Sequence, residues 1–197
     1  MILRGKHWEE TGWANWIKDG RQKTYRPSLY TAPVIKLNFL ALGSLEESVE
    51  NRGYINRTEG AIIEALVLKF NVLQVKKDCI GVIAPYRAQI DHLTNLLSSY
   101  LGVEINTVDK FQGRENKIIL LSFVRSGSMD DSNVHSELLE SINRLTVSVT
   151  RAQYKFIAIG CTRTLSKIDV TNRLIKYVRK NDMIVSLTKQ ELQDMSQ

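Results

Sequence analysis

Three polar clusters with phosphate-binding residue types lie beside apolar runs of the 197-residue sequence. The cluster "PYRAQ" (85–89) follows an apolar run, "DKFQGRE" (109–115) precedes a second, and "NRLTVSVTRAQ" (143–153) precedes a third. Arginine can donate two parallel N–H bonds to a phosphate group, and glycine lets the backbone approach a ligand closely. These residue types indicate an anionic ligand, such as a nucleotide or a nucleic acid.

The first cluster is expected at the start of a helix, where free backbone amides favour phosphate. Arg87 and Gln89 can add a cation and an amide to such a site. An alternative stays open, because polar residues also solvate the first turn of an ordinary helix.

The second cluster is expected between two strands. Thr107 and Asp109 end one strand, and residues 112–115 form the turn before the next. Gly113 permits a tight turn, while the glutamine and the glutamate beside it can accept hydrogen bonds from ribose hydroxyls or orient a partner arginine. An ordinary polar turn explains these residues equally well.

The third cluster is expected on a helix, where Arg144 and Arg151 lie nearly in line, two turns apart. Ile142, Leu145 and Val149 form a separate stripe about 120° away. Apolar residues on several sides predict a largely buried helix. Arg151 then lies either in an ion pair or at the rim of a cleft, where it can stabilise charge during phosphoryl transfer.

The elements between the clusters predict a three-layer α/β fold with a mostly parallel sheet, because helices alternate with continuous apolar strands. Ligands of such sheets bind beyond the carboxyl ends of the strands, so we look for chemistry at that edge. Thr58 is the expected N-cap of the first helix. Strands are predicted at 34–42, 79–85, 103–108, 117–123 and 154–160, helices at 57–73, 86–102 and 137–153, loops at 43–56 and 126–136, and a helix, a strand and a helix at 169–195.

Composition narrows the class of protein only moderately. The net charge of +6 and pI of about 9.3 favour an anionic partner, although a merely basic surface is the alternative. Cys79 and Cys161 are expected to be free thiols, and the sequence has no ligand pattern for a metal or an iron–sulfur cluster. Neither a membrane-spanning run nor a signal peptide is evident, so we expect an intracellular protein.

A family resemblance rests on three segments in this order: "IGVIAPYRAQ", "VEINTVDKFQGRENKIILLSFVRS" and "NRLTVSVTRAQYKFIAIG". They resemble the last motifs of superfamily-one helicases of the RNA-surveillance and DNA-replication group, and most of all those of eukaryotic DNA-replication helicase/nucleases. The resemblance implies that 34–165 is the second of two RecA-like domains of the P-loop NTPase type. Residues 1–33 would be a basic, irregular lead-in and 166–197 an extension that packs on the domain. From residue type alone, Trp8, Trp13 and Trp16 of the lead-in are expected to pack on the domain, with base stacking as the alternative.

The resemblance also implies roles for individual residues. ATP with Mg²⁺ would lie between this domain and a first RecA-like domain, in cis or in trans, that holds most of it. Arg151 would be the catalytic arginine that reaches the γ-phosphate. The nucleotide-binding residues would be Gln112, Gly113, Glu115 and Arg144, with Glu115 near the ribose, and the nucleic-acid-binding residues Thr107, Tyr86, Arg87 and Gln89.

The partner implied is single-stranded or flapped DNA, with RNA left open, and the implied location is the nucleus, with the mitochondrion as a further possibility. The sequence has no G-x-x-x-x-G-K-[ST] phosphate loop, so we expect it to be inactive as a motor by itself. Two alternatives stay open: a nucleic-acid-binding or interaction module without ATPase activity, and a nucleotide-binding regulator of another family. The family's last motif reads R-R-L-N-V-A-x-T-R-A-K, from which this chain departs at Asn143, Thr146, Ser148 and Gln153.

Overall fold

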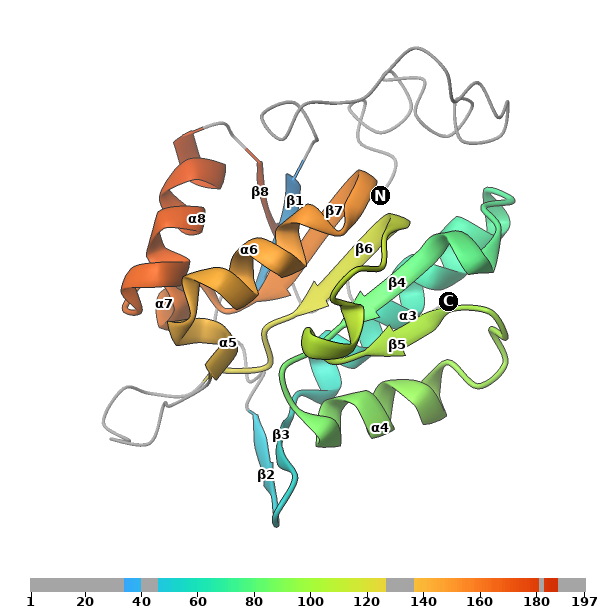
Figure 1. Ribbon diagram of the computed structural model, residues 1–197, viewed down its shortest axis with the longest axis horizontal. Coiled ribbons are helices and arrows are strands. Elements are labelled where there is room, and N and C mark those ends of the chain that lie inside the picture. The colour runs from blue at the N-terminus through green and yellow to red at the C-terminus, as the bar shows by residue number, and fades with distance from the viewer. Residues whose placement is uncertain (1–33, 40–45, 127–136, 181–182, 188–197) are drawn as a thin grey trace.

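The computed structural model describes residues 34–39, 46–126, 137–180 and 183–187, which form one six-stranded parallel sheet with helices on both faces (Figure 1). The strand order across the sheet is β5-β4-β6-β7-β1-β8. The predicted three-layer α/β fold is therefore confirmed. The strands are β1 (Val34–Phe39), β4 (Ile80–Ile83), β5 (Glu104–Asn106), β6 (Asn116–Ser122), β7 (Ala152–Gly160) and β8 (Ile184–Leu187).

The sheet separates two apolar cores. On β6, Ile118 and Leu120 pack under α3 and α4, whereas Ile119 and Leu121 pack in the second core with residues of α5–α8. This alternation follows from the two-residue period of a strand, and both sets are fully buried because both faces are covered. The helices are α3 (Arg57–Val72), α4 (Arg87–Leu96), α5 (Glu137–Glu140), α6 (Ile142–Thr150), α7 (Thr162–Leu165) and α8 (Asp169–Lys180), with short 3₁₀ turns η2 (Lys77–Cys79) and η3 (Asp109–Phe111).

The first helix begins two residues earlier than its predicted cap implies. Asn56 has an extended backbone, with φ −132° and ψ 100°, and its side chain accepts a hydrogen bond from the amide of Glu59. It is therefore the N-cap, and the prediction of Thr58 in that role is wrong because Thr58 already lies within the helix.

A β-hairpin occupies part of the predicted loop at 43–56. Its strands are β2 (Glu47–Val49) and β3 (Gly53–Ile55), paired antiparallel and projecting from the sheet (Figure 1). Each strand has only three residues, too few for a hydrophobic alternation to be recognised. Tertiary contacts hold the hairpin instead, including a bond from the amide of Ala88 to the carbonyl of Arg52.

The predicted helix at 137–153 is two helices and the start of a strand. Ser141 breaks it with an extended backbone and caps α6 by accepting from the amide of Arg144. The predicted burial of this helix is also wrong, because only Leu145 and Ser148 of α6 are buried and Ile142 is 48% exposed. The helix covers the sheet with a single narrow stripe.

The tail contributes a strand to the main sheet. After α8 the chain returns as β8, which pairs parallel to β1 at the edge of the sheet. The predicted final helix, the tryptophan-containing lead-in and nearly all of the predicted loop at 126–136 lie outside the described residues.

Candidate nucleotide and nucleic-acid sites

The predicted site residues lie on two opposite sides of the sheet, one where the parallel strands begin and one where they end (Figure 1). We call the side where the strands begin the amino edge; it contains residues 112–115 and 151, which precede β6 and β7. We call the side where they end the carboxyl edge; it contains residues 84–89, 107 and 123–126, which follow β4, β5 and β6. The seven residues of β6 separate the edges by about 20 Å. We expected the site residues beyond the carboxyl ends of the strands, and this is wrong for residues 112–115 and Arg151. They lie at the opposite end because each connection runs back along the sheet before its next strand begins.

Arg151 lies at the C-cap of α6 and is half-buried. Its Nε donates to the carbonyl of Val147 at 3.1 Å, and its Nη2 donates to Oγ1 of Thr150, also at 3.1 Å. Its Nη1 reaches the carbonyl of Arg114 at 3.5 Å. No described carboxylate forms an ion pair with Arg151. The guanidinium is therefore oriented by neutral oxygens, and its positive charge can interact with an anionic ligand.

The turn beside Arg151 is exposed. Gln112, Gly113 and Glu115 all face solvent, and Gly113 has φ +80°, a left-handed conformation that glycine adopts without strain. Glu115 accepts a hydrogen bond from the Gln153 amide at 3.3 Å. The structure thus brings Arg151 and the turn at 112–115 together at one edge, which is the grouping that the family resemblance implies.

Arg144 does not join this group. Its Nε lies 3.3 Å from the Asp109 carboxylate, which sits in η3 on the same face of the sheet as α6. This is a partly exposed ion pair of the kind that contributes little to stability. Seven residues of helix place Arg144 about 10 Å along the axis from Arg151.

At the carboxyl edge, Tyr86 is the N-cap residue of α4, Arg87 is exposed and Thr107 is half-buried. Thr107 and Tyr86 follow neighbouring strands, as β4 and β5 pair in register up to Ile83 and Asn106. The predicted phosphate site at the start of α4 is partly filled, because the carbonyl of Arg52 takes the amide of Ala88.

Gln89 lies inside the domain rather than on its surface. Its side-chain oxygen accepts from the amide of Asn56 at 2.8 Å, and its nitrogen donates to the Asn56 carbonyl and to Oγ of Ser122. The residue is fully buried. A direct contact between Gln89 and nucleic acid would require this network to open.

A strained turn follows β6 at the centre of the same network. The amide of Arg125 donates to the carbonyl of Phe123 at 2.8 Å across Val124, whose φ is 69°. This is a γ-turn with a positive φ at a β-branched residue, a costly conformation that surrounding structure must enforce. Glu59 enforces it by accepting from the amide of Val124 at 2.9 Å and from Oγ of Ser122 at 2.6 Å, while Asn56 donates to the Val124 carbonyl.

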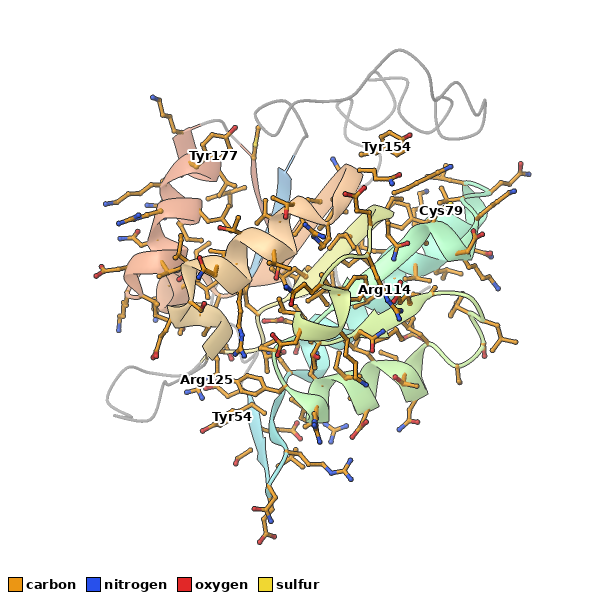
Figure 2. All side chains as sticks on the ribbon, in the orientation of Figure 1. Tyr54, Cys79, Arg114, Arg125, Tyr154 and Tyr177 are labelled. Atoms are coloured by element: carbon orange, nitrogen blue, oxygen red, sulfur yellow. The ribbon has the colours of Figure 1, made fainter. Side chains whose placement is uncertain are left out.

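The turn directs Arg125 toward the hairpin, and Figure 2 labels Arg125 and Tyr54 close together there. The side chain of Arg125 is 3% exposed, its guanidinium carbon lies 4.1 Å from the Tyr54 ring centre, and its Nε lies 3.2 Å from Glu46. Burial opposes the charge, but the Tyr54 hydroxyl and Glu46 outweigh it and raise the pKa of Arg125. Glu46 also accepts from the amide and hydroxyl of Ser126.

Sequence reasoning missed this network, which comprises Glu46, Tyr54, Asn56, Glu59, Ser122 and Arg125. One signal was present, because an arginine directly after the apolar run of β6 is an unusual place for charge. Glu59 gave no signal, since a carboxylate is common in the first turn of a helix. Only the fold shows that residues 46–59 and residues 122–125, which are 63 or more positions apart, meet.

A second buried charge lies behind the amino edge. Lys155 of β7 is buried, and the loss of hydration lowers the pKa of its amine to about 7. Burial also raises the pKa of the Cys79 thiol, which keeps it in the unreactive protonated form.

Comparison with known proteins matches a family model described as an AAA domain to residues 13–163. The chain belongs to the AAA domain family. The chain is 40% identical over 146 residues, 74% of its length, to a DNA replication ATP-dependent helicase/nuclease of Schizosaccharomyces pombe. It is 37% identical over 196 residues, 94% of its length, to the Xenopus laevis protein of that name, and 35% identical over 157 residues, 75% of its length, to a regulator of nonsense transcripts 1 homolog of Arabidopsis thaliana.

These relatives confirm the resemblance to the DNA-replication and RNA-surveillance helicases, and they identify this AAA domain as a helicase-related motor domain. The chain spans 10–17% of the length of the three relatives. Within the described ranges, no three His, Cys, Asp or Glu side chains are placed to hold a metal ion, and no helix has the length and apolarity to cross a bilayer.

Proposed function

We propose that this chain is the second motor domain of an ATP-dependent DNA helicase and supplies Arg151 to the γ-phosphate. The observation that carries the proposal is the state of the two arginines of α6. Arg144 is neutralised by Asp109, whereas Arg151 is held by carbonyl and hydroxyl oxygens at the amino edge. A guanidinium oriented without a carboxylate is suited to stabilise charge on a transferring phosphoryl group.

The residues around Arg151 fit one side of a nucleotide. Gln112 and Glu115 are exposed hydrogen-bonding groups that can meet ribose hydroxyls, and the space beside Gly113 is open, since a Cβ there would meet nothing within 4 Å. ATP with Mg²⁺, when bound, supplies the phosphoryl group whose transfer to water drives a motor. We assign the phosphate loop and the metal carboxylate to a first RecA-like domain, in cis or in trans.

We assign nucleic acid to the opposite edge, at Tyr86, Arg87 and Thr107. Arg87 is exposed and acts as the cation, and Thr107 offers a hydroxyl to the backbone. Single-stranded or flapped DNA is the proposed substrate and the nucleus the proposed location, because the names of the yeast and frog relatives specify DNA replication. RNA is the other substrate to test, because the plant relative is named for nonsense transcripts.

The test of Arg151 replaces the matching segment of the Schizosaccharomyces pombe helicase/nuclease with this chain and measures DNA-stimulated ATP hydrolysis. Arg151→Ala is expected to lower the rate by about 10³-fold or more, since an arginine finger contributes about 10³- to 10⁵-fold. Arg57→Ala is the control, and it should leave the rate unchanged. Arg57 is an exposed arginine of α3 that pairs with Glu47 of β2. Equal rates for Arg151→Ala and the unmodified chimera would overturn the proposal.

A second candidate function is a nucleic-acid-binding module without ATPase activity. It is favoured by Gln153, which stands where the family pattern has lysine and gives Glu115 a neutral partner. The isolated chain is expected to hydrolyse no ATP under either function. An inactive but DNA-binding chimera would select the second candidate.

A further inference from the structure

Residues 161–180, which include α7 and α8, carry most of the net positive charge of the protein. Residues 161–180 contain six basic side chains and one acidic side chain, a net charge of +5, against +6 for the entire chain. All six are exposed: Arg163, Lys167, Arg173, Lys176, Arg179 and Lys180. The charge of this protein is therefore concentrated in about a tenth of its sequence rather than spread over its surface.

Helical geometry arranges three of these residues in one stripe. The buried residues of α8 are Thr171, Ile175 and Val178, which face α5, α6, α7 and β1. At about 100° per residue, the stripe of Arg173, Lys176 and Lys180 lies directly opposite this buried arc. Figure 2 shows the nitrogen-tipped side chains of α8 projecting outward from the domain.

These basic side chains lack acidic partners in the described part of the chain, as does the exposed Arg87 of the carboxyl edge. By contrast, Arg52, Arg57 and Arg114, which are also exposed, each form an ion pair with a nearby carboxylate. None of the six basic residues of 161–180 forms one with any carboxylate in the described ranges. Within the described ranges, the excess of basic over acidic side chains is therefore concentrated in this segment.

We infer that the outer face of α8 is a second nucleic-acid-binding surface, separate from the carboxyl edge, and that it binds the phosphate backbone. The stripe from Arg173 to Lys180 rises about 10 Å, the length of about three phosphates at 3.4 Å per strand. Tyr177 flanks the stripe and is 37% exposed, and an aromatic ring beside a basic stripe is suited to stack on a base of a single strand. The partner class follows from the proposed function, but the surface does not depend on Arg151 or on ATP.

The experiment measures binding of the full 197-residue chain to a fluorescent 30-nucleotide single strand by anisotropy at several salt concentrations. The variant Arg173→Gln/Lys176→Gln/Lys180→Gln is expected to weaken binding at 50 mM salt by about tenfold or more. It should also lower the slope of log affinity against log salt by about 2, since each phosphate contact contributes about 0.7 for single strands. The matched control, Arg173→Lys/Lys176→Arg/Lys180→Arg, conserves the charges and should bind like the unmodified chain.

Tyr177→Ala separates stacking from charge. It is expected to weaken binding to the single strand by about fivefold, with little effect on a duplex of equal length, because stacking requires an unpaired base. The stripe residues are exposed, so thermal unfolding of the triple variant should match that of the unmodified chain.

Further outcomes distinguish this inference from the proposed function. Unchanged binding by the triple glutamine variant, together with weaker binding by Arg87→Gln, overturns the inference and leaves the carboxyl edge as the nucleic-acid surface. No binding by the unmodified chain at 50 mM salt also overturns it, while the ATP hydrolysis test of Arg151 is unaffected. Displacement of the DNA by poly-glutamate at equal charge concentration would show that the partner class is wrong.

Discussion

The two edges of the sheet hold their polar residues in opposite ways. At the amino edge, Gln112, Gly113 and Glu115 are exposed, and the half-buried Arg151 donates only to neutral oxygens. At the carboxyl edge, Glu59 and Gln89 are fully buried, and each makes two or more hydrogen bonds within the domain. The amino edge presents its turn to solvent, whereas the carboxyl edge contains a buried network that joins α3, α4, the hairpin and the end of β6.

This difference separates function from stability. A buried polar group costs free energy when its partner is removed, whereas an exposed one exchanges its partner for water. Substitutions at the amino edge should therefore change ligand binding and leave folding intact. Substitutions in the buried network should unfold the domain before they reveal anything about a ligand.

The largest expected effect is at Glu59. Glu59→Ala removes the acceptor for Ser122 and for the strained amide of Val124, so the free energy of unfolding in urea should fall by about 4 kcal/mol. Glu115→Ala removes the same side chain from the amino edge and should cost less than about 0.5 kcal/mol. Equal losses for the two variants would abolish the distinction between the edges.

Two glycines with similar backbones sharpen the comparison. Gly53 has φ +90° and Gly113 has φ +80°, so alanine should cost each about 1 kcal/mol of backbone strain. At Gly53 a Cβ would also lie 2.5 Å from the ring of Tyr86, whereas at Gly113 it would meet nothing within 4 Å. Gly53→Ala should therefore destabilise by about 3 kcal/mol and Gly113→Ala by about 1 kcal/mol in the same urea titration.

The pH dependence of stability should originate partly between α3 and α4. His92 packs against Gly60, and burial followed by the charge of Arg57 lowers its pKa, while Glu47 and Glu64 oppose that shift. The unfolded chain then binds more protons than the folded one below about pH 6.5, so stability should fall as pH decreases through that range. His92→Gln should flatten the dependence of the unfolding midpoint on pH between 7 and 5; an unchanged curve would assign it to other groups.

The smallest expected effect restores the family residue at the amino edge. Gln153→Lys replaces a hydrogen bond to Glu115 with an exposed ion pair, which should stabilise by about 0.5 kcal/mol at most. A double-mutant cycle with Glu115→Gln isolates this coupling. A coupling of several kcal/mol would mean that the amino edge is buried in solution, contrary to the structure.

Sequence periodicity was sufficient to predict the layers but not the hairpin. The apolar runs of β4, β6 and β7 are continuous because both faces of these strands are buried, and that pattern is visible in the sequence. The strands of the hairpin have three residues each and are held by contacts to Ala88 and Ser126, which are distant in sequence. Contacts between residues that are distant in sequence cannot be predicted from local sequence patterns.

The sequence by itself determined the α/β class, the order of the motifs and the residue types available for binding phosphate, because these depend on local periodicity and side-chain chemistry. Only the tertiary structure decided which residues share an edge. In a parallel sheet every connection returns across the sheet, so Tyr86 and Arg151 fall on opposite edges although both lie next to a strand. The structure likewise pairs Arg144 with Asp109, whereas none of the described carboxylates pairs with Arg151, since the partner of a charge is set by packing between distant segments.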